Sequence, residues 1–512
     1  MIFSQKTFLL LTTISCIYTS SLFGADDAIK PVTPNASPEA KALLEFLYST
    51  SGKYTLTGQH NYPNTKDRNS QFAADYIGKT PVVWSTDWGH AEEGNTDSYL
   101  ARPDIVEEAK RQHQLGSLVT ICWHAVPPTA DEPVTFRRQR DAEPGALASV
   151  QGQLLDQQFE DVLTPGTELN KRWTAQVDAI AFHLKKLQDA HVPVLWRPYH
   201  EMNGDWFWWG GRRGEYSTKA LYRQMFDRLV NHHKLDNLIW VWSVDRVSKP
   251  EMQHSEYYPG NDYLDVLALD VYGSDFDQSY YDSLVALSNG KPLALGEVGN
   301  PPALDILDSQ PKWGFWVIWA GMVRNTPKKQ HRILVNDPRI LSLEDPAYWE
   351  AIAPFRAACG LPPLPIKDEG PVDFSGEWVF DEDRSILDNF GVGNLPYKLG
   401  ITHKGNDLAI QKTFIVEWGD DRVTEEKLTL DGEEIKSEFR NSPRITTAKL
   451  SEEGDILVIE SKVTFSRGDR TFEMVTNEKW SLQERGKVLS IEQSSTSFRR
   501  ERKITMIFNA RR

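Results

Sequence analysis

The sequence predicts an α/β fold, a (β/α)8 TIM barrel, followed by a small all-β C-terminal domain that forms a lipocalin-like barrel or a sandwich. Over residues 40–362, short apolar runs alternate with segments of helical periodicity, as in βαβ units around a parallel sheet. A Pro-rich stretch at 361–371, LPPLPIKDEGP, then ends this pattern. Beyond it, apolar residues alternate and short Gly-containing turns recur at hairpin spacing, which indicates antiparallel strands.

The chain has 512 residues, enough for one large and one smaller domain. We expect a signal peptide at 1–25, a catalytic barrel at 40–362, a Pro-rich linker at 363–371 and an antiparallel β domain of unknown role at 372–512. Lys6, an apolar run from Thr7 to Tyr18 and the small residues after it have the layout of a secretory signal peptide and are too short to span a membrane. Cys16 matches a lipoprotein cleavage site poorly, so we expect a secreted or periplasmic protein.

Eight apolar runs predict the barrel strands, and polar or aromatic residues follow most of them. The predicted strands are 54–57, 81–85, 117–123, 192–196, 238–242, 266–269, 292–295 and 314–318, with helices at 99–114, 170–190, 217–234, 279–288 and 346–358. The carboxyl ends of barrel strands lie on one face, so residues from Gln59 to Trp319 should converge on one cleft. The long aperiodic segment 124–169 should wall one side of it.

The stretch at 192–210, VPVLWRPYHEMNGDWFWWG, contains the first catalytic candidate. Glu201 lies just past a buried strand, where the active sites of parallel barrels are found. The flat indole faces nearby suit a pyranose ring. Glu297, in LGEVG after the seventh strand, lies roughly opposite in the barrel and is the predicted partner carboxylate.

Two carboxyl groups flanking one bond are what glycoside hydrolysis requires. Apolar surface beside Glu201, such as Trp206, should favour the protonated form and a general acid role. Hydrogen bonds from Arg197 or Tyr272 could keep Glu297 ionised, as a nucleophile must be. A separation of about 5–5.5 Å between the two carboxyl groups would predict retention of anomeric configuration.

The motif WRPYHEMNGDWFWWG resembles the acid/base signature of glycoside hydrolase family 26, whose members include endo-β-1,4-mannanases of clan A. The resemblance extends over about 40–362 and includes TLTGQHNYP, CWHA, DVYG and LGEVG. It implies a retaining mechanism, with Glu201 as acid/base and Glu297 as nucleophile. It also implies a set of substrate-binding residues, namely His124, His200, Trp206, Tyr272 and Trp319. We group Arg197 with these, although it could instead pair with a buried carboxylate at the top of the barrel.

These observations favour a secreted retaining endo-β-1,4-mannanase, a monomer acting on β-mannan or a related plant polysaccharide. A β-1,3-xylanase, a mixed-linkage glucanase or an exo-acting mannobiohydrolase is the alternative within the family. The last would follow if segment 124–169 blocked one end of the cleft. A non-catalytic carbohydrate-binding protein is the alternative from another class, and the presence of both carboxylates argues against it. Asp87, Asp245 and Asp270 also follow strands and are reserve candidates.

Composition excludes several other classes of function. The net charge is −15 and no long basic run occurs, so the barrel region has no electrostatic footprint for nucleic acid. We expect no cofactor, and no metal at His60, Asp87 and His124, because no HxH or HExxH spacing supports one. Beyond the signal peptide no apolar stretch approaches membrane-spanning length. Cys122 and Cys359 could form a disulfide or remain free thiols.

Two features of the C-terminal region remain open. Trp378, Trp418 and Trp480 could be platforms for polysaccharide or residues of the domain core. The basic residues Arg499 to Lys503 are expected to lie in a solvated edge strand.

Overall fold

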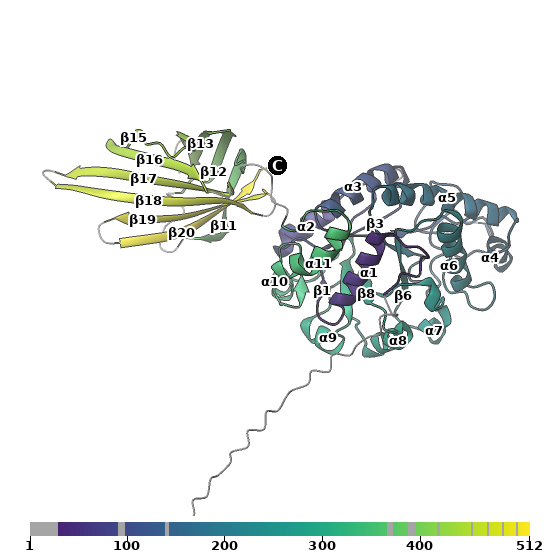
Figure 1. The fold of residues 1–512 in the computed structure, drawn as a ribbon. Coiled ribbons are helices and arrows are strands. Elements are labelled where there is room, and N and C mark those ends of the chain that lie inside the picture. Colours follow the sequence, from purple (N-terminus) through teal and green to yellow (C-terminus); the bar gives the residue numbers. More distant parts are fainter. Residues whose placement is uncertain are drawn as a thin grey trace, which may run out of the picture. The chain divides into compact units, whose positions relative to one another are not determined.

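The structure is a computed structural model. It describes residues 29–90, 98–138, 143–365, 372–387, 395–416, 420–451, 454–467, 470–483, 486–497 and 500–511. The predicted signal peptide, residues 366–371 of the predicted linker, and Trp418 lie outside these residues. The chain divides into two compact units, Met1–Pro365 and Ile366–Arg512, and each is described by itself (Figure 1).

Parallel strands close into an eight-membered barrel in the first unit. They are β2 (Gly58–His60), β3 (Val83–Asp87), β4 (Leu118–Trp123), β5 (Val194–Pro198), β6 (Leu238–Asp245), β7 (Val266–Val271), β8 (Leu293–Val298) and β9 (Trp313–Ile318). Each pairs with the next, and β9 pairs with both β8 and β2, which closes the barrel. Two short strands, β1 (Thr55–Leu56) and β10 (Ile340–Leu341), extend the sheet beside β9. The predicted (β/α)8 barrel is confirmed.

Helices surround the barrel (Figure 1). They are α1 (Pro38–Thr50), α2 (Arg68–Ile77), α3 (Arg102–Gln114), α4 (Asp156–Leu163), α5 (Glu168–Asp189), α6 (Thr218–Phe226), α7 (His254–Tyr257), α8 (Gln278–Ser288), α9 (Leu304–Ser309), α10 (Lys328–Val335) and α11 (Pro346–Ala358). The helix expected at 217–234 is α6 followed by a π-helical turn, Asp227–His232. The segment 124–169 is not wholly irregular, because it contains α4. This helix buries only Phe159 and Val162, so its periodicity in the sequence is faint.

Alternate residues of each strand enter two different apolar cores. In β5, Val194 and Trp196 face the surrounding helices, whereas Leu195 faces the barrel interior with residues of α1 and α11. Most tryptophans of this unit belong to these cores, and the fully buried ones are Trp84, Trp88, Trp196, Trp208, Trp209, Trp240, Trp242, Trp313 and Trp316. The inward positions nearer the carboxyl ends of the strands are polar, and they include Arg197, Ser243 and Asp270. The barrel therefore changes from an apolar to a charged interior as it approaches the cleft.

The second unit is an antiparallel meander whose first strand pairs with its last. Its strands are β11 (Gly376–Ile386), β12 (Lys398–Lys404), β13 (Asp407–Phe414), β14 (Arg422–Thr429), β15 (Ile435–Phe439), β16 (Ser442–Leu450), β17 (Ile456–Arg467), β18 (Arg470–Gln483), β19 (Val488–Ser497) and β20 (Arg500–Ala510). The sheet order runs from β14 through β11, β20 and β19 to β15. The basic residues Arg500 to Lys503 begin β20, which lies between β11 and β19 in the sheet order. The pairing of β20 with β11 runs only from Thr505 to Ala510, so Arg500 to Lys503 pair with β19 on one side, which agrees with the expected edge position; Arg499 lies outside the described residues.

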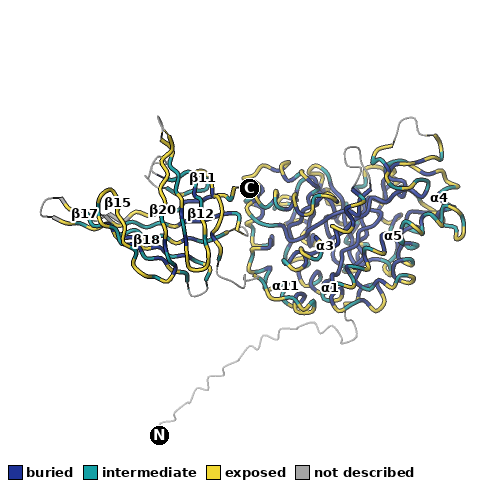
Figure 2. The backbone as a smooth tube through the Cα atoms, turned by 90° about the horizontal axis from the view of Figure 1, so that it is seen from above, coloured by how far each residue is buried: buried dark blue, intermediate teal, exposed yellow. Residues whose placement is uncertain are grey.

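Buried residues of several strands form one apolar core in this second unit, and Figure 2 shows buried and exposed residues alternating along the strands. Trp378 and Trp480 are 2% and 0% exposed and belong to its core, as does Phe508 of β20. Neither tryptophan is therefore a surface platform for a ligand. The up-and-down strand order agrees with the predicted all-β domain.

Two further expectations concern cysteines and membranes. Cys122 and Cys359 are both free thiols, in β4 and after α11 respectively. Among the residues that the structure describes, no helix has both the length and the apolar character needed to cross a bilayer.

The close packing of β2 against β9 leaves no room for a side chain at Gly58, so a substitution there should destabilise the barrel. A Cβ atom at this position would lie 2.2 Å from the backbone oxygen of Trp316, which cannot rotate away. We expect Gly58→Ala to lower the free energy of unfolding by about 1–3 kcal/mol, measured by thermal denaturation of the full chain. Gly321→Ala is the control, since its Cβ would meet only the Arg324 guanidinium at 3.6 Å. Equal stability of the two variants would contradict the prediction.

Candidate active site

A cleft opens at the carboxyl ends of the barrel strands. Its lining residues are His124, Phe136, Gln151, His200, Glu201, Trp206, Phe207, Asp245, Arg246, Ser248, Tyr272, Glu297 and Trp319. Both predicted catalytic carboxylates are in this set. So are the predicted substrate-binding residues, with the exception of Arg197. The convergence expected of the strand ends is therefore present from His124 to Trp319, whereas Gln59 is not in the lining and binds the backbone oxygens of Ile318 and Ala320.

Glu201 follows β5 in a left-handed backbone conformation. Its φ is +50°, and a non-glycine residue rarely adopts this region unless its surroundings enforce it. Asn203 supplies one constraint, because its amide donates to the backbone oxygens of Asp245 (2.7 Å) and Met252 (3.0 Å). Its carbonyl accepts from the Asp245 backbone N–H at 2.7 Å. Asn203 therefore ties the Glu201 loop to the end of β6.

The four aromatic residues after Glu201 divide into two pairs. Trp206 and Phe207 line the cleft, whereas Trp208 and Trp209 are fully buried. The indole N–H of Trp208 donates to the backbone oxygen of Ala125 (2.8 Å), and that of Trp209 donates to the backbone oxygen of His200 (2.9 Å). Trp208 and Trp209 thus hold the loop, and Trp206 and Phe207 are the two that border the cleft.

A β-bulge in β8 turns Glu297 toward the barrel interior. The pairing with β7 matches Leu295 to Leu269 but Glu297 to Asp270, so Gly296 is the extra residue. Strict alternation from Leu293 and Leu295 would have directed Glu297 outward, toward the helices. Gly296 also permits a close approach, because a Cβ there would lie 2.7 Å from Asp270 Oδ1. Gly296, the first glycine of LGEVG, therefore forms the bulge that directs Glu297 into the cleft.

Glu297 is held by donors on both of its oxygens. The Arg197 guanidinium donates to Oε1, and the Tyr272 hydroxyl donates to Oε2 at 2.8 Å. Arg197 also binds Asp270 through Nη1 at 3.0 Å. Its side chain is buried behind Glu297 and does not line the cleft. Both hydrogen bonds stabilise the ionised form of Glu297.

Glu201 has the opposite electrostatic environment. Burial raises the pKa of its carboxyl group well above the usual value, and the negative neighbours Glu297, Asp270 and Asp245 raise it further. One interaction opposes this, the Trp206 indole N–H donating to Oε2 at 2.6 Å. Carboxyl oxygens of Glu201, Asp270 and Glu297 lie within 4.8 Å of one another. A protonated and an ionised carboxyl group at such a separation can perform acid-assisted nucleophilic displacement.

Aromatic and imidazole rings form the rest of the cleft wall. Trp319 stacks on the buried His60, with ring centroids 3.8 Å apart and planes 13° apart, so one indole face remains for the cleft. His124 meets His200 edge to face at 4.4 Å. Burial lowers the pKa of His60 to about 3 and that of His200 well below 6.5. Both rings are therefore neutral hydrogen-bonding groups at pH 7.

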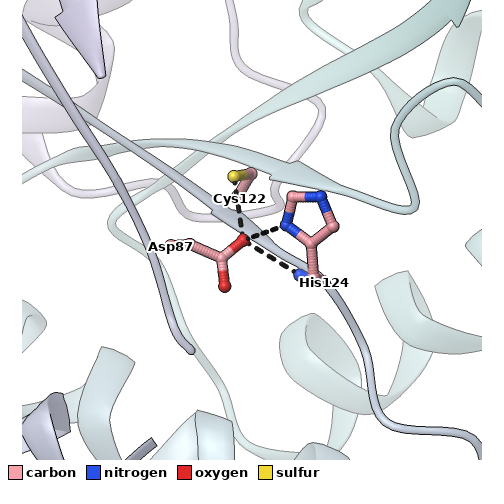
Figure 3. Close-up of side chains that lie close together, drawn as sticks. All are labelled: Asp87, Cys122 and His124. Atoms are coloured by element: carbon pink, nitrogen blue, oxygen red, sulfur yellow. Dashed lines mark hydrogen bonds and ion pairs between the residues drawn. The ribbon is translucent and has the colours of Figure 1, made fainter. Parts of the chain in front are cut away.

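Of the three reserve candidates, Asp87, Asp245 and Asp270, only Asp245 lies in the cleft lining. Asp245 lines the cleft, while Asp270 is buried against Arg197 and the Ser243 hydroxyl. Asp87 is not in the lining and binds the side chains of Cys122 and His124 (Figure 3).

Four lining residues were not anticipated from the sequence: Phe136, Gln151, Arg246 and Ser248. The last two directly follow β6, so their position past a strand end was a usable signal. Phe136 and Gln151 come from the aperiodic segment between β4 and α4, where no local pattern marks which side chains face a cleft.

Comparisons with known proteins agree with this geometry. The family model described as Glycosyl hydrolase family 26 matches residues 32–340. The mannan endo-1,4-beta-mannosidase of Thermothelomyces thermophilus is 32% identical over 335 residues, which cover 62% of this chain and 63% of that protein. The matched parts span about half to two thirds of the length of the first curated relatives.

Solved structures match the same part of the chain. GH26A from Muricauda sp. is 41% identical with a TM-score of 0.56, covering 60% of this chain and 98% of that one. The GH26-CBM35 beta-(1,4)-mannanase of Podospora anserina is 29% identical with a TM-score of 0.51, covering 64% and 70%. As the motif around Glu201 predicted, the chain belongs to glycosyl hydrolase family 26.

Proposed function

We propose that this chain is a retaining endo-β-1,4-mannanase that hydrolyses mannan-type polysaccharide by double displacement. The observation that carries the proposal is the pair Glu201 and Glu297, whose carboxyl oxygens lie within 4.8 Å in opposite electrostatic environments. This spacing fits a nucleophile and an acid/base better than the wider gap that inverting enzymes need for a water. The choice of mannan is supported by the names of the curated relatives.

In the proposed first step, an ionised oxygen of Glu297 attacks the anomeric carbon while Glu201 gives its proton to the departing glycosidic oxygen. A covalent glycosyl–enzyme ester and a free aglycone result. In the second step, Glu201 removes a proton from water, and the water oxygen displaces Glu297 from the anomeric carbon. Glu201 is thereby reprotonated, and the product keeps its configuration.

The remaining residues of the cleft fit a sugar ligand. Trp206, Phe207 and Trp319 offer aromatic faces and edges to pyranose rings. The neutral His200, 3.6 Å from Glu297 Oε1, can hydrogen-bond a hydroxyl without adding charge. Arg197 acts behind Glu297, which it holds ionised and in place.

Substitution of Glu201 and Glu297 tests the roles proposed for these two carboxylates. Glu201→Gln should lower kcat on soluble β-1,4-mannan on the order of 10²- to 10⁴-fold, because the leaving oxygen then has no proton donor. Glu297→Gly should be inactive on mannan but should regain turnover of an activated mannoside in azide, with a glycosyl azide of inverted configuration as product. Reducing-sugar assays and NMR of the anomeric proton measure these outcomes.

Glu256→Gln, a change at an exposed carboxylate of α7, is the matched control and should retain full activity. Wild-type turnover by Glu201→Gln would remove the acid/base assignment. A product of inverted configuration from the wild-type chain would contradict the double displacement. A product profile from mannan, xylan and mixed-linkage β-glucan separates an endo-mannanase from the related glycanases and from an exo-acting enzyme.

The pH dependence of kcat/KM gives a second prediction. Deprotonation of Glu201 should cause the alkaline limb, because its raised pKa keeps it protonated at lower pH. Trp206→Phe removes the donor that favours the ionised form, so the alkaline limb should move to higher pH. Asp245→Asn removes a neighbouring negative charge, so the limb should move to lower pH. Shifts of both variants in the same direction would contradict this electrostatic account.

We also propose that the protein is secreted or periplasmic, on the strength of the signal-peptide pattern at residues 1–25. Amino-terminal sequencing of the exported protein should show cleavage near Gly24 or Ala25. Recovery of the uncleaved chain from the cytoplasm of the native host would contradict export.

A further inference from the structure

Asp87 and His124 form a buried pair beside the cleft (Figure 3). Asp87 is the last residue of β3, and His124 directly follows the neighbouring strand β4, so parallel pairing places them together. Asp87 Oδ2 accepts hydrogen bonds from His124 Nδ1 at 2.6 Å and from the His124 backbone N–H at 3.0 Å. Asp87 Oδ1 accepts from the Gly89 backbone N–H at 2.7 Å. The carboxylate is thus fixed on both oxygens.

These contacts determine which ring nitrogen of His124 carries the proton. Burial by itself would raise the pKa of Asp87, but His124 and the other donors hold that pKa well below its usual value. An ionised carboxylate only accepts hydrogen bonds, so Nδ1 must be the donor. Among the described residues, no protein atom hydrogen-bonds Nε2, and His124 lines the cleft. Nε2 is therefore the nitrogen that a ligand meets.

The ring of His124 is also prevented from turning. It packs edge to face against three rings, and the distances between ring centroids are 4.4 Å to His200, 5.5 Å to Phe207 and 5.6 Å to Phe136. Asp87 therefore sets the tautomer of a ring whose orientation packing already restricts.

Two other roles for this cluster fit the geometry less well. Asp87, Cys122 and His124 have potential ligand atoms within 4.8 Å of one another, as a metal site would. A metal requires the Cys122 thiolate, but burial raises the pKa of this thiol well above its usual value, and the thiol donates to Asp87 at 3.1 Å. A nucleophilic role is also disfavoured, because Asp87 does not line the cleft and its oxygens are engaged by donors.

We propose that Asp87 is a positioning residue that fixes His124 as the Nδ1–H tautomer, so that Nε2 accepts a hydrogen bond from a hydroxyl of the bound sugar. The proposal rests on the proposed glycosidase function, which supplies the sugar. It assigns no contact between Asp87 and the substrate. The effect of Asp87 on turnover must therefore pass through His124.

A double-mutant cycle on the full chain tests this dependence. With soluble β-1,4-mannan as substrate, we expect Asp87→Asn to lower kcat/KM on the order of 10- to 100-fold, as loss of such supporting partners commonly does. His124→Ala should have an effect of similar size. The double variant should be no less active than His124→Ala alone, within about threefold, because Asp87 then has nothing to position. If the loss of kcat/KM in the double variant equals the product of the losses in the two single variants, the proposal is overturned.

A matched control removes a different donor to the same oxygen. Cys122→Ala takes away the thiol contact with Asp87 Oδ2 but leaves both His124 contacts, so kcat/KM should stay within about threefold of the wild-type value. A loss as large as that of Asp87→Asn would show that packing around Asp87, and not the histidine, is responsible. Thermal midpoints of all variants separate unfolding from altered turnover.

A substrate-free measurement keeps the inference testable even if Asp87→Asn does not fold. In the wild-type chain labelled with ¹⁵N-histidine, imidazole NMR should show a proton on Nδ1 of His124, assigned by loss of its signals in His124→Gln. A proton on Nε2 would overturn the proposal. This result is independent of catalysis, so an inactive wild-type protein with the Nδ1–H tautomer would refute the proposed function and leave the tautomer assignment standing.

Discussion

The buried guanidinium of Arg197 lies between Glu297 and Asp270 and is the cationic partner of both carboxylates. Three carboxyl groups lie within 4.8 Å of one another at this end of the barrel, where burial makes uncompensated charge costly. Arg197 contacts two of them, and Glu201 is the one it does not reach. The position of a single side chain therefore gives Glu297 and Asp270 a cationic partner and leaves Glu201 without this one.

This separation follows from strand geometry. Arg197 occupies an inward position of β5, two residues beyond the apolar Leu195, so its charge lies at the boundary between the barrel core and the cleft. Glu201 comes only four residues later but belongs to the loop, and its left-handed backbone directs it back over the cleft. The strand thus provides the cation and the loop provides the acid. Glu297 reaches Arg197 from β8 across the barrel interior, because the bulge at Gly296 turns it inward.

The sequence alone predicted those parts of the fold that depend on short-range patterns. Buried parallel strands read as continuous apolar runs, and the barrel strands β3 to β9 were found within a few residues of their observed bounds. The run predicted as the first strand, 54–57, is instead the short strand β1, and the barrel strand β2 (Gly58–His60) directly follows it without an apolar run of its own. Glu201 and Glu297 were found because each follows such a run. The bulge at Gly296 was not foreseen, since it is defined by register with β7 and not by local composition.

Features that depend on distant partners were harder to predict. Arg197 was grouped with substrate-binding residues, with Glu297 or a buried carboxylate as its other possible partner. The structure shows contacts with both, 73 and 100 residues away in β7 and β8, and the sequence could not choose between the two roles. The pairing of Thr505 to Ala510 in β20 with β11 joins segments more than 110 residues apart, and no local pattern in the sequence indicated it. Phe136 and Gln151 lie in a segment without periodicity, and their approach to the cleft requires the tertiary fold.

The contacts of this aperiodic segment couple the wall of the cleft to the acid/base loop. The Gly152 backbone N–H donates to the Trp206 backbone oxygen at 2.8 Å, and the Gln153 side chain donates to the Phe207 backbone oxygen at 2.7 Å. Gln151 and Phe207 also form an isolated antiparallel bridge. This wall of the cleft is thus part of the support of Trp206, the residue that hydrogen-bonds Glu201. Under the proposed function, a change in the wall that alters the fit of the substrate would also act on the position and proton affinity of Glu201.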